Sequence, residues 1–112
     1  MNKEEKNLYD AKARIFKALG HPTRLWITER LAQGECCVCN LVEPLGADFS
    51  TVSKHLSVLR EAGIVDDDKR GKEVYYSLKV PCIMNFMSCV EDVLENRVRE
   101  QMELLGSRRK II

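Results

Sequence analysis

The apolar residues of this chain change their spacing near residue 64, and that change restricts the fold more than any other feature. Upstream of it, apolar residues recur every three or four positions, which is typical of helices that bury one face. Residues 64–78 instead form two short arms rich in β-favouring residues around Gly71, a pattern that indicates a hairpin. From Pro81 the helical spacing returns and continues for about 20 residues. The sequence therefore predicts a mainly α fold with one two-stranded β-hairpin.

Four helices are expected before the hairpin, and each has recognisable end signals. Thr23 is expected to cap the second helix, and Ser50 or Thr51 the fourth, because short hydroxyl side chains accept hydrogen bonds from free helix N–H groups. The third helix is short and is expected to carry a cluster of cysteines. A glycine marks the C-terminal end of each of the four helices, as is usual at helix C-termini. The expected spans are about residues 5–19, 23–34, 36–46 and 50–63.

The length of the chain allows one folded domain, residues 1–112, because 112 residues with 45% apolar content do not support two cores. Within it, residues 36–63 are expected to form a helix-turn-helix and residues 64–78 a wing. The last helix is longer than is needed to close such a core. We expect its surplus apolar face, with that of the first helix, to form a symmetric homodimer through residues 1–19 and 81–105.

Composition disfavours several classes of protein. No apolar run approaches the roughly 20 residues that span a membrane, and residues 1–7 are charged, so we expect a cytoplasmic protein with no membrane partner. Thiols stay reduced in that compartment, and five is an odd number of cysteines, so metal or redox roles are favoured over a disulfide framework. With 18 basic and 17 acidic side chains, contact with nucleic acid needs a local basic surface.

A short helix, a tight turn at Gly46, a second helix and a hairpin, in that order, predict a winged helix-turn-helix. The sequence shows this order in four segments, Leu19–Leu25, Glu35–Leu41, Ser50–Gly63 and Gly71–Tyr76. With these segments the chain resembles the ArsR/SmtB family of metal-responsive repressors over most of its length. The resemblance implies a homodimer that holds a double-stranded DNA operator and releases it when a metal or metalloid binds.

The fourth helix and the hairpin offer the groups that such a protein needs to contact DNA. Short hydroxyls and helix amides near the helix N-terminus can approach phosphates, and one or two longer side chains can reach base edges. Cations at the tip of the hairpin suit phosphates or the minor groove. The carboxylates of Asp66–Asp68 would repel phosphate unless they face away from it. The candidate DNA-binding residues are Ser50, Thr51, Ser53, Lys54, His55, Arg70 and Lys72.

The thiols determine what such a repressor senses. In the family, a Cys-Val-Cys segment at this place supplies ligands, so the resemblance implies that Cys37 and Cys39 bind the ion. Arsenic-sensing members that carry three ligands on this helix have a further cysteine where this chain has Val42. Residues at i and i+2 point to different sides of a helix, so binding by both cysteines would require a distorted helix start.

The other cysteines leave two arrangements open. Either one distant thiol, from Cys82 or Cys89, completes the helix pair, or Cys82 and Cys89 build a separate site; Cys36 is a further candidate for the third sulfur. Clustered thiolates favour soft ions, and we expect arsenite or antimonite first, then cadmium or lead. Zinc ranks below these because the last helix has no histidine, which zinc sensors of this family typically use there.

Other uses of the cysteines are also compatible with the sequence. A redox or persulfide sensor on the same scaffold fits clustered thiols, which oxidise readily. A constitutive regulator would need none of them. Cys36 and Cys39 have the spacing of a dithiol oxidoreductase, but that fold needs a strand before the motif, and the sequence predicts helices on both sides. We therefore expect a regulator and not an enzyme.

Overall fold

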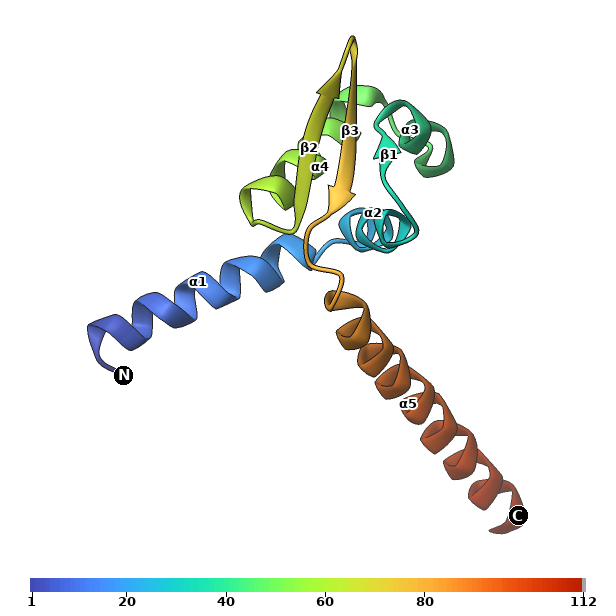
Figure 1. Cartoon of the computed structure of the whole chain (residues 1–112). Helices are drawn as coiled ribbons and strands as arrows, with labels where there is room; N and C mark the ends of the chain where they lie inside the picture. Colours follow the sequence, from blue (N-terminus) through green and yellow to red (C-terminus); the bar gives the residue numbers. More distant parts are fainter. Residues whose placement is uncertain (112) are drawn as a thin grey trace. The chain divides into compact units, whose positions relative to one another are not determined.

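The computed structural model describes residues 1–111, and the side chains of residues 1–107. Its contacts divide the chain into two units, Met1–Pro81 and Cys82–Ile112. The first unit contains helices α1 to α4 and a three-stranded antiparallel sheet, and the second contains helix α5, Ile83–Ile111 (Figure 1). In chain order the elements of the first unit are α1 (Lys3–Leu19), α2 (Pro22–Ala32), β1 (Cys36–Cys37), α3 (Cys39–Leu45), α4 (Phe49–Glu61), β2 (Val65–Arg70) and β3 (Glu73–Leu78).

The predicted winged helix-turn-helix is confirmed, but the predicted helix caps are wrong. α2 is capped by His21, whose Nδ1 accepts the Thr23 N–H at 3.1 Å, and not by Thr23 itself. α4 is capped by Asp48, whose Oδ1 accepts the Thr51 N–H at 2.7 Å. Thr23 and Thr51 therefore donate the N–H groups that are capped, and neither residue supplies the cap. An imidazole and a carboxylate, each just upstream of the helix, supply the acceptors.

The third helix was predicted wrongly in its first part. Cys36 and Cys37 form strand β1, and α3 begins only at Cys39. β1 pairs antiparallel with β3, with Cys36 opposite Tyr76 and Cys37 opposite Tyr75, so β3 lies between β1 and β2 (Figure 1). The sheet thus has one strand more than the predicted hairpin. A strand of two residues has no periodicity of its own, and only its distant partner defines it.

Two glycines with positive φ form the turns that separate these elements. Gly46, at φ 60°, ends α3 and allows the chain to turn into α4. Gly71, at φ 64°, forms with Lys72 the two-residue turn between β2 and β3, because Arg70 and Glu73 pair directly across the hairpin. Both turns occur where the sequence predicted them.

One apolar core joins helices α2 to α4 and the sheet. α3 contacts α4, α4 contacts β2, and α2 contacts β3, so the helix-turn-helix and the wing share this core. The hydroxyl of buried Thr28 is satisfied because its Oγ1 donates to the Arg24 carbonyl at 2.8 Å. The largest fully buried apolar side chains are Ile27, Leu41, Val52, Leu56, Leu59, Ile64 and Val65.

α5 forms the second unit and carries a stripe of exposed apolar side chains along its length. They recur at spacings of three and four residues, so they share one face of the helix. No helix among the described residues is long and apolar enough to cross a membrane. The stripe consists of Val90, Val93, Leu94, Val98, Met102 and Leu105.

Replacing Leu41 by alanine is expected to destabilise the protein by about 2–5 kcal/mol, because the side chain of Leu41 is fully buried and the surrounding core relaxes only partly around the cavity. The matched control is Phe49→Ala, since Phe49 is 59% exposed and its truncation should cost less than about 1 kcal/mol. Denaturant unfolding at one fixed protein concentration measures both. Equal losses in the two variants would contradict the assignment of Leu41 to the core.

Candidate metal centre and nucleic-acid interface

Cys37 and Cys39 lie together at the junction of β1 and α3. Cys37 ends β1 and is only 3% exposed, whereas Cys39 begins α3 and is exposed. Their Cα atoms are 5.2 Å apart, and their sulfur atoms are joined as a disulfide, where we expected reduced thiols. The Cys39 N–H also donates to Cys37 Sγ at 3.2 Å. Because Cys37 belongs to a strand, the pair meets without the distorted helix start that we expected.

A third potential ligand near this pair, Glu73 at the start of β3, was missed by the sequence analysis. One carboxylate oxygen of Glu73 and the two sulfurs of Cys37 and Cys39 all lie within 4.8 Å of one another. After β1, the Val38 N–H donates to the Val74 carbonyl at 3.2 Å, which keeps the start of α3 beside the first residues of β3. No local sequence pattern signals this contact, because Cys39 and Glu73 belong to elements that are distant in the sequence.

The other three cysteines are free thiols in different settings. Cys36 is 3% exposed, and its Sγ donates to the Cys37 carbonyl at 3.5 Å. Successive strand residues face opposite sides of a sheet, so the side chains of Cys36 and Cys37 diverge. Cys82 precedes α5 and Cys89 lies within it, and both are exposed in the second unit.

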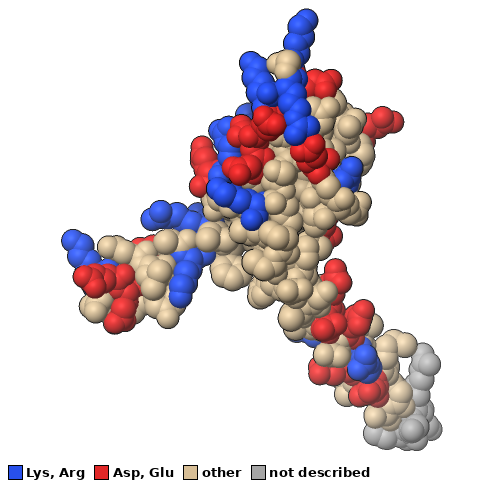
Figure 2. Space-filling view, viewed as in Figure 1, with Lys and Arg blue, Asp and Glu red and all other residues tan. Residues whose placement is uncertain are grey.

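The predicted DNA-binding residues of α4 lie at its N-terminal half. Ser50, Thr51 and Lys54 are exposed, whereas Ser53 and His55 are partly buried. Arg70 and Lys72, at the end of β2 and in the turn of the wing, are also exposed. Figure 2 shows Lys and Arg side chains gathered at the tip of the wing, with acidic side chains below them.

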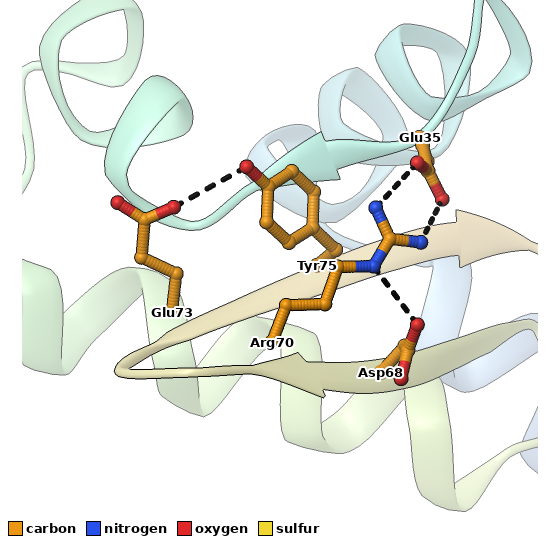
Figure 3. Close-up of polar contacts among 5 residues, drawn as sticks. All are labelled: Glu35, Asp68, Arg70, Glu73 and Tyr75. Carbon is orange, nitrogen blue, oxygen red and sulfur yellow. Dashed lines mark hydrogen bonds and ion pairs between the residues drawn. The ribbon is translucent and has the colours of Figure 1, made fainter.

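Arg70 is held by carboxylates of the protein itself (Figure 3). Its Nη1 and Nη2 donate to the two carboxylate oxygens of Glu35, at 2.7 and 2.9 Å, and its Nε donates to Asp68 at 3.0 Å. The guanidinium also lies over the Tyr75 ring, 4.5 Å from the centroid. These contacts raise the pKa of Arg70, through Glu35 first and then Asp68, and the same bond lowers the pKa of Glu35. The Tyr75 hydroxyl in turn donates to Glu73 at 3.2 Å, which raises the tyrosine pKa.

Each carboxylate of the acidic run in β2 is paired with a cation. Asp67 accepts from Arg60 of α4 at 2.9 Å, Asp68 accepts from Arg70, and Asp66 lies 3.9 Å from the Lys79 ammonium. These pairs are solvent-exposed and each contributes little to stability. Their effect is to neutralise the negative charges of Asp66–Asp68 locally, which reduces the repulsion of phosphate that we expected from this run.

His55 of the second helix of the helix-turn-helix is in contact with a helix cap. Its ring centroid lies 4.5 Å from that of His21, the residue that caps α2. Burial lowers the pKa of His55, and the nearby charges of His21 and Arg24 lower it further. His21 uses Nδ1 as an acceptor, so its cap requires that nitrogen to be unprotonated.

A helix-turn-helix followed by a hairpin with a basic tip defines a winged helix-turn-helix DNA-binding protein. The family model described as bacterial regulatory protein, arsR family, matches residues 21–67. An uncharacterised HTH-type transcriptional regulator of Methanocaldococcus jannaschii is 37% identical over 86 residues, which cover 76% of this chain and 97% of that protein. The chain belongs to the ArsR family of transcriptional regulators, and the expectation that it is a regulator rather than an enzyme is confirmed.

The names of two further relatives mention an ion. The cadmium resistance transcriptional regulatory protein CadC of Listeria innocua is 41% identical over 74 residues, which cover 65% of this chain and 62% of that protein. The arsenical resistance operon repressor of Escherichia coli is 45% identical over 65 residues, which cover 57% of this chain and 56% of that protein.

Solved structures agree with the fold. The crystal structure of Rv0081 from Mycobacterium tuberculosis matches with a TM-score of 0.74 and 33% identity, over 85% of this chain and 96% of that chain. The solution structure of a homodimeric winged helix-turn-helix DNA-binding domain, Mb0332 from Mycobacterium bovis, matches with a TM-score of 0.75 and 28% identity, over 89% of this chain and 93% of that chain.

Acidification is expected to destabilise the protein through His55. Because its pKa is lowered from 6.5 in the folded state, the unfolded chain takes up a proton first as the pH falls. The stability that His55 contributes is therefore complete above pH 6.5 and is lost as the pH falls through the folded-state pKa. Denaturant unfolding between about pH 7.5 and 5 should show this loss, and His55→Gln should reduce it.

The chosen pH range separates His55 from the carboxylates. The pKa values of Glu35 and Asp48 are also lowered, but from 4.5 and 3.8, so their contributions to stability are lost only at more acidic pH. An unchanged pH dependence in His55→Gln would contradict the prediction.

Proposed function

We propose that this repressor holds a double-stranded DNA operator and releases it when a thiophilic ion binds Cys37 and Cys39. One observation supports this proposal most strongly. The two sulfurs meet where β1, an edge strand of the wing sheet, passes into α3, the first helix of the helix-turn-helix. An ion that draws the sulfurs into its own coordination geometry therefore acts on both DNA-reading elements through one short segment.

Arsenite or antimonite is our first choice of inducer, with cadmium, lead and zinc as alternatives. Trivalent arsenic forms three bonds to sulfur, so Cys36, Cys82 or Cys89 would supply the third thiol. Soft thiolate ligands favour all of these ions over hard cations. The names of the E. coli and Listeria relatives, which mention arsenical and cadmium resistance, support both kinds of ion. Moving a two-state equilibrium from 99:1 to 1:99 needs a difference of about 5.5 kcal/mol between the two states, so binding must be tight.

The DNA contacts in this proposal come from α4 and the wing. Hydroxyls and amides at the N-terminal end of α4 approach phosphates, and longer side chains reach base edges. Arg70 reaches a phosphate only by exchanging Glu35 and Asp68 for it. The proposed contacts are Ser50, Thr51, Ser53, Lys54, His55, Arg70 and Lys72.

The proposal includes a homodimer in the cytoplasm, where thiols are kept reduced. Exposed apolar side chains on α1, such as Leu8 and Ile15, and the stripe on α5 are the surfaces that a second copy would cover. The homodimeric solution structure among the structural relatives supports this assembly.

A redox sensor on the same scaffold is a second candidate, favoured by the disulfide contact of Cys37 and Cys39. In this reaction the two thiols lose two electrons and two protons to an oxidant such as a peroxide, and a sulfur–sulfur bond forms. Operator release would then follow oxidation without any ion. In both mechanisms, the conformational change that releases DNA would start at the junction of β1 and α3.

Arsenite should release the reduced protein from a fluorescent fragment of its own promoter at low micromolar concentration, in an anisotropy titration run in parallel with cadmium and zinc. Cys37→Ser and Cys39→Ser should each bind the fragment normally but resist release, because the ion loses a thiolate. Single serine variants of Cys36, Cys82 and Cys89 identify the third sulfur. Release by mild oxidant, with none by any ion, would instead assign the protein to the redox class.

Lys54→Ala should weaken operator binding and make it less sensitive to salt. Each lost phosphate contact lowers the slope of log affinity against log salt by about 0.9. Lys6→Ala, which removes the same charge near the start of α1, is the matched control and should leave the slope unchanged. Anisotropy titrations at several salt concentrations measure both slopes. Equal slopes for Lys54→Ala and the unmodified protein would remove Lys54 from the proposed surface.

A further inference from the structure

The wing strand β3 presents a carboxylate to the two sulfurs of the proposed ion site. Cys37 lies opposite Tyr75, and Glu73, two residues away on the same strand, faces the same side of the sheet. Beyond the two paired residues of β1, the Val38 N–H donates to the Val74 carbonyl at 3.2 Å, which keeps the start of α3 beside the start of β3. As a result, donor atoms from Cys37, Cys39 and Glu73 lie within 4.8 Å of one another, although the residues come from separate parts of the sequence.

We propose that Glu73 completes the Cys37–Cys39 site, giving a set of two sulfurs and one oxygen for a divalent ion of the cadmium or zinc type. This inference rests on the proposed function, in which Cys37 and Cys39 bind the inducer. It specifies a third ligand for the divalent alternatives among the proposed inducers, cadmium and zinc.

The spacing of the donors fits such an ion after a small adjustment. Ligands about 2.3 Å from a tetrahedral ion are about 3.8 Å apart, and the three donor atoms here lie within 4.8 Å of one another. To bind an ion, the two sulfurs must be reduced, deprotonated and moved apart from their bonded contact. Both Cys39 and Glu73 are exposed, so their side chains have room for this change and water has access to a fourth position.

The chemistry of the three donors selects among the ions. Two thiolates and a carboxylate carry three negative charges, which suits a divalent cation that accepts both sulfur and oxygen, as zinc does. Trivalent arsenic needs three sulfurs, and Glu73 offers it none. An arsenite site would therefore have to take its third ligand elsewhere, whereas a cadmium or zinc site is complete in the first unit, apart from a water.

Glu73 also connects the ion to the side chains that hold the wing (Figure 3). It accepts the Tyr75 hydroxyl at 3.2 Å, and the Tyr75 ring lies under the guanidinium of Arg70. Arg70 pairs with Glu73 across the hairpin turn, and its side chain is bound to Glu35, the residue before β1. An ion that takes one oxygen of the Glu73 carboxylate would constrain the acceptor of Tyr75 and would join the first residue of β3 to the start of α3.

The test is a cadmium titration of the reduced protein without DNA. Cadmium binding is monitored by the ultraviolet charge-transfer absorption of cadmium thiolates, and a chelator that competes for cadmium sets the affinity scale. Glu73→Gln should lower cadmium affinity by about tenfold or more, since even ligand-supporting residues contribute 10–100-fold. The thiolate band should persist, because both sulfurs remain. Glu43→Gln, an exposed glutamate of α3 outside the donor set, is the matched control and should bind cadmium like the unmodified protein.

A second variant tests whether the third donor atom determines which ion is bound. Glu73→Cys would supply a third sulfur at the same place and should raise arsenite affinity by about tenfold or more, whereas Glu73→Gln should leave arsenite affinity unchanged. Unchanged cadmium affinity in Glu73→Gln, with binding lost in Cys37→Ser and Cys39→Ser, would overturn this inference and leave the proposed function intact. Unchanged binding in the two serine variants would overturn the proposed function itself.

Discussion

A very short antiparallel ladder, Cys36 opposite Tyr76 and Cys37 opposite Tyr75, holds the candidate site together. Each backbone hydrogen bond contributes only about 0.5–1.5 kcal/mol net, so two residue pairs make a weak element. Burial of Cys36, Cys37 and Val38, each no more than 3% exposed, adds to it. In the proposed mechanism, so short a ladder would shift readily when an ion imposes new positions on the sulfurs.

In the first unit, acidic side chains near the wing lie beside basic ones and form ion pairs with them. The acidic run in β2 would be an obstacle to DNA binding if its carboxylates were free, yet each lies beside a cation from α4, the wing or the following segment. The bidentate bond between Glu35 and Arg70 joins the chain before β1 to the wing. The protein, whose net charge is only +1, thereby keeps a basic wing tip beside paired acidic side chains (Figure 2).

The sequence predicts what local patterns determine and misses what distant partners determine. The helices and the hairpin follow from apolar spacing and from Gly46 and Gly71, whose backbone angles few other residues adopt. Strand β1 exists only because β3 lies beside it, and reading it as helix separated Cys37 from Cys39 and concealed Glu73. The helix caps were misplaced because Thr23 is a familiar capping residue, although His21 performs the role.

The ion pairs of Arg70 with Glu35 and Asp68 affect how the protein would approach DNA. A guanidinium whose charge is already neutralised by Glu35 and Asp68 adds little to the electric field at a distance. If the proposed contacts hold, long-range attraction of DNA would depend on cations outside this network, such as Lys54 and Lys72. In that proposal Arg70 would act only after contact, when a phosphate replaces its carboxylates, so it would affect how long the wing stays on DNA more than how fast the protein arrives.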